Sequence, residues 1–243
     1  MKNVILKIKK NEQISDSIYK MVLEGPIDEI KRSGEFIEIE LPKYYLRRPF
    51  SVSRINENSI EILYKVLGHG TYDMTTYRAD MELSCLIGLG NGFDCAYAKQ
   101  PLLIAGGIGI APMFALAEDF IKRGIKPIIL YGAQDQSDLV CIEELKKLGQ
   151  LILCTDNGSL GFHGNPVQYL KENLIHFDFY YACGPVRMLE ALKEHSSNGC
   201  LSLEARMGCG FGACMGCSIK TINGPKRVCK EGPVFLASEV IFS

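Results

Sequence analysis

The sequence lacks tryptophan, a long apolar segment and an excess of either charge. The missing tryptophan excludes no function. No run approaches the ~18 apolar residues of a membrane-spanning helix, so no membrane span is expected. Lysine interrupts the apolar residues of the opening segment, MKNVILKIKKNEQ, which therefore does not resemble a signal peptide. The formal net charge of −1 gives no reason to expect a nucleic-acid partner.

The chain is rich in cysteine, with ten in 243 residues. Without a secretion signal, these are expected to be thiols or metal ligands in a cytoplasmic protein, and not a disulfide framework. Four of them follow the spacing C-x4-C-x2-C-x11-C near the C-terminus: Cys209, Cys214, Cys217 and Cys229. The first three positions match the plant-type [2Fe–2S] pattern, with the fourth thiolate further along the chain.

Glycines alternate with these cysteines in the run GCGFGACMGC. Such a loop can adopt positive φ angles and aim backbone N–H groups at sulfur, because glycine has little steric restriction. A [2Fe–2S] cluster is the favoured interpretation. Zinc stays an alternative, although zinc modules usually carry two separated C-x2-C pairs. Structural disulfides and chance clustering of reduced core cysteines are the remaining alternatives.

The pattern of short apolar runs predicts a multidomain β plus α/β protein. Residues 1–97 show strand-like runs separated by turn signals, which is typical of a small antiparallel barrel. The predicted strands are Val4–Ile8, Ile18–Leu23, Phe36–Leu41, Phe50–Ser53 and Ile60–Val66. Strands and helices then alternate over residues 98–199, which predicts a doubly wound parallel sheet. Residues 200–243 form a small cysteine module with an apolar tail.

Within residues 98–199, the strands and helices are predicted from buried runs and helical spacing. The predicted strands are Leu102–Gly107, Pro127–Tyr131, Leu151–Cys154 and Phe179–Cys183. The predicted helices are Ala111–Arg123, Leu139–Leu148, Val167–Asn173 and Val186–His195.

The segment Arg48-Pro49-Phe50-Ser51 indicates a flavin site in the barrel. Arginine offers a rigid fork for phosphate, and serine offers a hydroxyl to the edge of a flavin ring. Gly70-Thr71, at a predicted helix start, can present backbone N–H groups to a pyrophosphate. Four residues are a weak motif, and an ordinary strand with a surface arginine is the alternative.

Two later turns indicate a nucleotide site. The turn at Gly106–Pro112 follows a strand and opens a helix, where backbone N–H groups can approach a nucleotide. It is not G-x-G-x-x-G, so a plain Rossmann dehydrogenase is disfavoured. Cys183-Gly184 ends a later strand, and both turns should face one crevice at the carboxyl ends of the sheet. Packing glycines and a buried core thiol are the alternatives.

In this order, R-P-F-S, G-T, G-G-I-G-I-A-P and C-G-P resemble the ferredoxin reductase superfamily. With the cysteine spacing and the tail V-C-x-x-G-P-V-F, the whole chain resembles the electron-transfer subunits of B-class, NAD-dependent dihydroorotate dehydrogenase. The resemblance implies FAD bound by Arg48, Pro49, Phe50, Ser51, Leu63, Tyr64, Lys65, Gly70 and Thr71. It implies a [2Fe–2S] cluster on the four cysteines and NAD on the side of Gly107, Gly109, Cys183 and Gly184.

The resemblance also implies a function and a partner. Electrons from dihydroorotate, oxidised at FMN in a separate catalytic subunit, would pass through the cluster and FAD to NAD+ in pyrimidine biosynthesis. A heterotetramer of two plus two subunits is implied, and no side chain of this chain needs to act as a general acid or base. Gln134, where relatives often carry arginine, favours NAD over NADP. Asn157 departs from the family's T-D-D-G-S.

Two alternatives remain. The first is a flavin and iron–sulfur subunit of an NAD(P)H–ferredoxin reductase or sulfhydrogenase complex. The second is a regulatory module whose cysteines bind zinc. The apolar tail, Gly232–Leu236 and Val240–Phe242, fits a permanent contact with a partner subunit, and a strand packed on its own domain fits it equally well.

Overall fold

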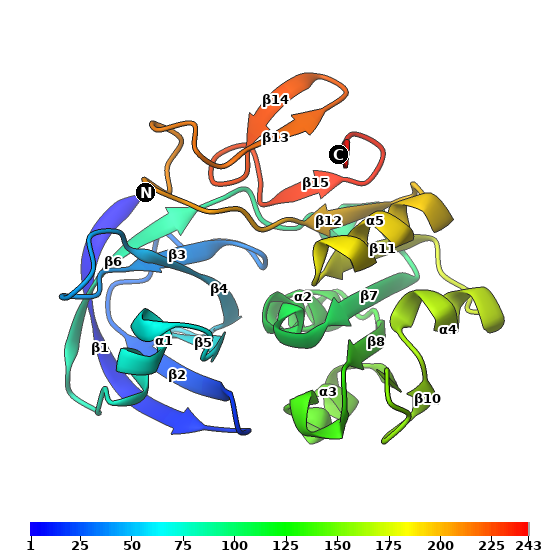
Figure 1. Cartoon of the computed structure of the whole chain (residues 1–243), viewed down its shortest axis with the longest axis horizontal. Coiled ribbons are helices and arrows are strands. Elements are labelled where there is room, and N and C mark those ends of the chain that lie inside the picture. Colours follow the sequence, from blue (N-terminus) through cyan, green and yellow to red (C-terminus); the bar gives the residue numbers. More distant parts are fainter. Residues whose placement is uncertain (243) are drawn as a thin grey trace.

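A computed structural model describes residues 1–242 as a barrel beside a layered sheet, with the C-terminal segment lying across both (Figure 1). The barrel is closed in the order β1-β2-β5-β4-β3-β6. Its antiparallel strands are β1 Lys2–Gln13, β2 Ile18–Glu24, β3 Phe36–Ile39, β4 Arg48–Ile55, β5 Ser59–Lys65 and β6 Glu82–Leu89. The helix α1 (His69–Thr75) follows β5. Among residues 1–242, no helix has the length and apolar character needed to cross a membrane.

Alternation of apolar residues explains the barrel strands. In β1, Val4, Leu6 and Ile8 face the interior while Ile5 and Lys7 between them face solvent. The strand β6 shows the same alternation in ELSCLIGL but was not among the predicted strands. Its period of two was available in the sequence, so it could have been predicted from the same rule.

The second sheet has the strand order β10-β9-β8-β7-β11-β12-β15. The strands are β7 Pro101–Gly106, β8 Ile128–Ala133, β9 Gln150–Thr155, β10 Phe162–His163, β11 Phe179–Cys183, β12 Gly199–Ser202 and β15 Val234–Leu236. All neighbours run parallel except β15, which is antiparallel to β12. The predicted combination of barrel and parallel sheet is confirmed.

Helices cover both faces of this sheet. The helices are α2 Ala111–Lys122, α3 Ile142–Leu148, α4 Pro166–Glu172 and α5 Val186–His195. One face of β7, which includes Leu103, packs against α2 and α3, and the other face, which includes Ile104, packs against α4 and α5. Because successive side chains of β7 point to opposite faces and both are covered, the whole strand is buried.

One predicted helix is shorter than expected. The predicted helix Leu139–Leu148 begins only at Ile142, because Cys141 adopts a left-handed backbone with φ of 57°. A short 3-10 turn, Gln136–Asp138, precedes it. A left-handed residue cannot continue an α-helix, and cysteine gave no signal for this conformation.

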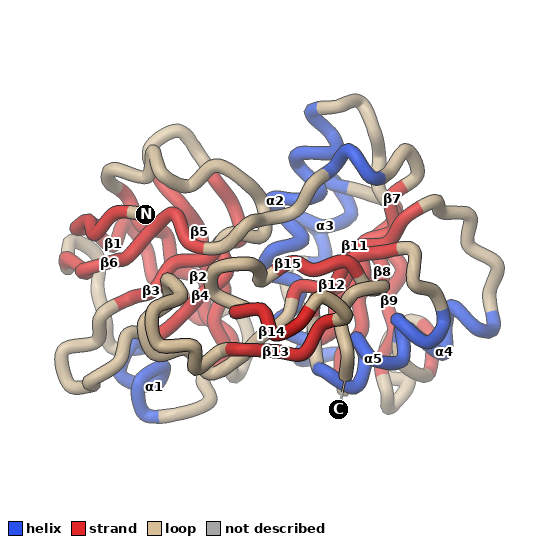
Figure 2. Tube along the Cα trace, turned by 90° about the horizontal axis from the view of Figure 1, so that it is seen from above, coloured by secondary structure: helices blue, strands red, loops and turns tan. Residues whose placement is uncertain are grey.

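The C-terminal segment is joined to the sheet at both ends. The strand β12 spans the predicted boundary at residue 200, and β15 pairs with it after the hairpin of β13 (Ser218–Thr221) and β14 (Gly224–Arg227). Seen from above, this hairpin lies over the junction of barrel and sheet (Figure 2). Val234 and Phe235 of the apolar tail are buried where β15 pairs with β12, so this part of the tail packs on its own domain.

Ion pairs connect the barrel to the helices of the sheet. Lys20 on β2 pairs with Glu144 on α3 at 2.8 Å. Arg54 on β4 pairs with Glu118 at 3.2 Å and with Glu144 at 2.9 Å, and its guanidinium lies 4.8 Å from the centre of the Phe114 ring. These half-buried contacts fix the barrel against α2 and α3.

Candidate functional site

A cleft of about 270 Å³ lies between the barrel and the sheet. The predicted flavin residues that line it are Arg48, Pro49, Phe50, Ser51, Leu63, Tyr64, Lys65 and Thr71. The strands β4 and β5 are neighbours in the barrel, which brings these segments to one wall. Gly70 does not line the cleft. It packs behind Arg48, because a Cβ atom at Gly70 would lie 3.4 Å from the Arg48 Nε.

The structure holds the Arg48 guanidinium in place from two sides. Its Nη1 donates to the Leu46 carbonyl at 2.5 Å, and the group lies 5.1 Å from the centre of the Tyr44 ring. A pre-positioned guanidinium is suited to bidentate contact with phosphate. The Thr71 hydroxyl accepts from the backbone N–H groups of Leu67 and Gly68, which fixes the start of α1.

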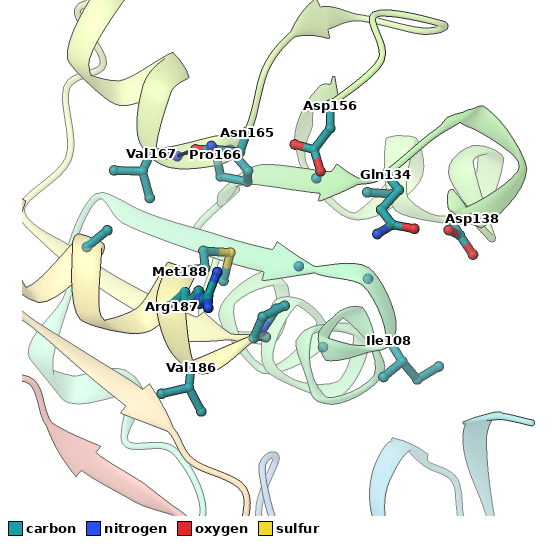
Figure 3. A pocket seen from close by; sticks show the side chains of 18 of the residues that line it. Ile108, Gln134, Asp138, Asp156, Asn165, Pro166, Val167, Val186, Arg187 and Met188 are labelled. Carbon is teal, nitrogen blue, oxygen red and sulfur yellow. Dashed lines mark hydrogen bonds between the residues drawn. The ribbon is translucent and has the colours of Figure 1, made fainter. Parts of the chain in front are cut away.

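A second cleft, of about 810 Å³, lies at the carboxyl ends of the parallel strands (Figure 3). The predicted residues Gly107, Gly109 and Gly184 line it, whereas Cys183 lines the flavin cleft instead. The two glycine turns touch each other, because a Cβ atom at Gly109 would lie 2.3 Å from the Cys183 carbonyl oxygen. Only glycine allows this approach, so the two turns predicted to share one crevice do meet.

Polar side chains line part of the second cleft. Gln134 and Asp156 follow β8 and β9 on one side, and Arg187 at the start of α5 lies on the other (Figure 3). All three are exposed to the cleft. The sequence argument used Gln134 and the stretch around Asn157, which includes Asp156. It missed Arg187, which gave no signal beyond following the turn at Cys183.

The two clefts adjoin each other. Three residues line both of them: Lys65, Ile108 and Glu204. Lys65 Nζ lies 3.1 Å from Asp138 Oδ1, an ion pair that bridges the barrel and the sheet. Glu204 was not predicted. Partial desolvation between the barrel and the sheet raises the pKa of the Glu204 carboxyl, although the side chain is exposed to the clefts.

Three of the predicted ligand cysteines lie in the loop before β13 and the fourth, Cys229, follows β14; the four gather as two pairs. Cys209 and Cys214 are hydrogen-bond neighbours, and the sulfurs of Cys217 and Cys229 lie 3.2 Å apart. Cys209 Sγ accepts from the backbone N–H groups of Ala213 at 3.2 Å and Cys214 at 3.4 Å. The last pair is buried and the first is accessible to solvent.

The pairs differ in their electrostatics. Burial raises the pKa of Cys209, but hydrogen bonds led by the N–H of Cys214 outweigh it and lower the pKa to about 6. Burial, with the neighbouring Cys217 thiol, raises the pKa of Cys229 to about 12. A metal must therefore displace the proton of Cys229, as ligation of a thiol by a metal does.

This geometry fits a two-iron cluster. Glycines surround Cys214, where added Cβ atoms at Gly208 and Gly216 would lie 3.3 and 3.5 Å from its sulfur. Across residues 1–242, no group of three or more His, Cys, Asp or Glu side chains is arranged to hold one metal ion. Four thiols within one C-terminal segment match the ligand set of a [2Fe–2S] cluster.

A buried carboxylate lies behind the cysteine loop. Glu38 on β3 is only 1 % exposed, and its Oε1 has no hydrogen-bond partner among the described residues. A Cβ atom at Gly210 would lie 2.3 Å from the Glu38 carboxyl carbon, so the loop backbone packs directly on this group. Burial, and then the charge of Cys209, raises the pKa of Glu38 to about 7. The sequence argument did not identify Glu38.

Two family models match the chain. Residues 204–241 match the iron–sulfur cluster binding domain of dihydroorotate dehydrogenase B, and residues 103–152 match the oxidoreductase NAD-binding domain. These segments contain the cysteine loop and the first part of the parallel sheet, respectively.

Curated relatives match the chain over nearly its whole length. The electron transfer subunit of dihydroorotate dehydrogenase B (NAD(+)) from Fusobacterium nucleatum is 39% identical and covers 96% of each chain. The subunit of the same name from Bacillus pumilus is 35% identical and covers 100% of each.

Solved structures share the fold. A chain of an NADH-dependent reduced ferredoxin–NADP oxidoreductase aligns with a TM-score of 0.89 at 24% identity, over 98% of this chain and 90% of that one. Phthalate dioxygenase reductase aligns with a TM-score of 0.66 at 20% identity, over 81% of this chain and 66% of its own.

Proposed function

This chain belongs to the family of electron transfer subunits of dihydroorotate dehydrogenase B (NAD(+)), and from that membership we propose how its parts divide the work. The chain is an oxidoreductase subunit that transfers electrons between a dihydroorotate-oxidising catalytic subunit and NAD+. We propose FAD in the 270 Å³ cleft, NAD(H) in the 810 Å³ cleft and a [2Fe–2S] cluster on Cys209, Cys214, Cys217 and Cys229.

The observation that carries this proposal is the spatial order of the three sites. Glu204 and Lys65 join the nicotinamide cleft to the flavin cleft. The flavin cleft is also lined by Met207, which precedes Cys209 by two residues, and by Pro233, which follows Cys229 by four. These lining residues support a flavin site that adjoins both the nucleotide site and the thiols, as an electron relay requires.

The chemistry of the proposed cofactors agrees with this order. A nicotinamide exchanges two electrons as a hydride, a [2Fe–2S] cluster exchanges one, and a flavin can do both. The protein's own residues bind and separate these groups. Arg48 holds phosphate, the turns at Gly107 and Gly184 approach the nucleotide, and N–H groups aimed at Cys209 stabilise its thiolate.

We further propose three divisions of the chain: 1–97 for FAD, 98–199 for NAD and 200–243 for the cluster. The partner is the FMN-containing catalytic subunit, in an assembly of two plus two in the cytoplasm. The family resemblance supports the stoichiometry. The ten unpaired thiols among the described residues support a reducing compartment.

The test is anaerobic purification with the co-expressed catalytic subunit. We expect the complex to contain one FAD, two irons and two sulfides per chain, and to reduce NAD+ with dihydroorotate. Zinc without iron or flavin would refute the assignment. Reduction of NAD+ by reduced ferredoxin, but not by dihydroorotate, would favour a ferredoxin reductase subunit instead.

A further inference from the structure

We propose that Glu204 binds the nicotinamide ring of NAD+ by charge, at the junction of the two clefts, and so makes the site prefer the oxidised cofactor. The inference deepens the proposed function and rests on its assignment of FAD and NAD(H) to these clefts. It concerns a residue that neither the motifs nor the family models single out as a ligand.

The position of Glu204 carries the first step. A hydride can pass between nicotinamide and flavin only where the two rings touch, and the walls shared by both clefts mark that place. Three residues form these shared walls: Lys65 from the barrel, Ile108 from the first glycine turn and Glu204 after β12. Among residues 1–242, Glu204 is also the only carboxylate that lines the flavin cleft.

The charge balance carries the second step. Lys65 is neutralised by Asp138 at 3.1 Å. Glu204 has neither an ion pair nor a hydrogen bond with any described residue, and its side chain is open to the clefts. Cys183 lies beside it, but burial first and then the charge of Glu204 raise the pKa of Cys183 to about 12, which keeps this thiol neutral. In its ionised form, Glu204 therefore places at the junction a negative charge that has no partner among the described residues.

The chemistry of the substrate gives that charge a role. The nicotinamide ring is cationic in NAD+ and neutral in NADH. When NAD+ is reduced, the N–H bond at the flavin breaks, a C–H bond forms at nicotinamide C4, and both electrons of the hydride move to the ring, which loses its positive charge. Glu204 exchanges no proton and no electron. Its carboxylate attracts the ring before the transfer, when the ring is cationic, and not after it, when the ring is neutral. The attraction is strong because water is displaced from the site.

The alternative role for Glu204 is purely local packing or flavin binding. Either role would act equally on both redox states of the nucleotide, because neither depends on the charge of the ring. The preference between a cationic and a neutral nicotinamide therefore separates the hypotheses.

The experiment is calorimetric titration of the oxidised, FAD-loaded complex with two nucleotides. One is NAD+, and the other is tetrahydro-NADH, an analogue whose nicotinamide ring is uncharged and cannot donate a hydride. For Glu204→Gln, we expect the Kd of NAD+ to rise about tenfold and the Kd of tetrahydro-NADH to change less than about twofold. Glu190→Gln, an exposed carboxylate of α5 that lines neither cleft, is the matched control and should change neither value.

A second variant keeps the test decisive. Glu204→Asp retains the charge on a shorter side chain and should keep most of the preference for NAD+. If Glu204→Gln weakened the binding of both nucleotides equally, or lost FAD, the inference would be overturned. Loss of the preference in Glu204→Asp as large as in Glu204→Gln would also overturn it. Failure of the wild-type complex to hold FAD or to bind either nucleotide would refute the proposed function itself.

Discussion

Arg48 shows how a single residue can be prepared for a ligand. Its guanidinium is restrained by the Leu46 carbonyl and the Tyr44 ring, and Gly70 leaves the space behind it. Such restraint lowers the entropy that binding a phosphate would otherwise cost. Lys65 is held in a different way, because it forms an ion pair with Asp138 between the barrel and the sheet domain.

Arg48→Ala is expected to weaken FAD binding about tenfold or more, because it removes a charged phosphate partner. The measurement is the flavin content after extended dialysis, together with the Kd of FAD. Arg78→Ala is the control, since Arg78 bonds only the carbonyls of Thr75 and Tyr77 and lines neither cleft. Unchanged flavin occupancy in Arg48→Ala would contradict the predicted role.

At the scale of elements, turns between strands and helices position the site. The 3-10 turn after β7, Gly107–Ile110, and the turn after β11 meet at Gly109 and the Cys183 carbonyl. The two turns lie side by side because β7 and β11 are hydrogen-bonded parallel neighbours at the centre of the sheet.

Gly109→Ala is expected to destabilise the protein by about 1–3 kcal/mol and to weaken NAD+ binding, because its Cβ would overlap the Cys183 carbonyl. Chemical denaturation and calorimetric titration measure the two effects. Gly68→Ala serves as the control, as nothing lies within 4 Å of its added Cβ. A Gly109→Ala protein with wild-type stability and affinity would show that the close approach is not needed.

Helix α3 anchors the barrel through Glu144. Burial raises the pKa of Glu144, but its contacts with Lys20 and Arg54 outweigh this and lower the pKa below its usual 4.5. The contribution to stability is therefore present above about pH 4.5 and is lost as the pH falls through the lowered pKa.

Glu144→Gln should lower the unfolding free energy by about 1 kcal/mol at pH 7, a modest value because the carboxylate is one-third exposed. The difference from wild type should shrink as the pH falls below 4.5, which denaturation curves at several pH values would measure. Glu143→Gln, on the same helix but paired only with Lys146 at the surface, should have little effect at any pH. A difference that grows in acid would contradict the assignment.

At the scale of the whole molecule, the proposed flavin cleft adjoins the proposed nucleotide cleft and is also lined by Met207 and Pro233, which are near the cysteines in the sequence. The cysteine loop is carried by its own hairpin, whereas the flavin residues come from the barrel. We therefore expect that the cluster can be lost without FAD, although Asn91, at the end of the barrel, donates to the carbonyls of Glu231 and Val234.

Cys217→Ala is expected to lose the cluster and largely keep FAD. Reduction of NAD+ by dihydroorotate should then stop, while NADH should still reduce the flavin. Iron and sulfide analysis with absorbance spectra measures cofactor content, and Cys154→Ala, a buried thiol of the sheet, is the control. Loss of FAD together with the cluster would show that the two sites are not independent.

The sequence by itself determined the order of barrel, parallel sheet and cysteine loop, because periodicity and glycine or cysteine spacing are local signals. It also indicated Arg48, Gly109 and the four cysteines. Only the tertiary structure decided the start of α3, the pairing of the thiols, and the burial of Val234 and Phe235 against β12. It alone brought Glu204 and Lys65 to one junction and Glu38 behind the cysteine loop. These features depend on contacts between residues far apart in the chain, and no local pattern records such contacts.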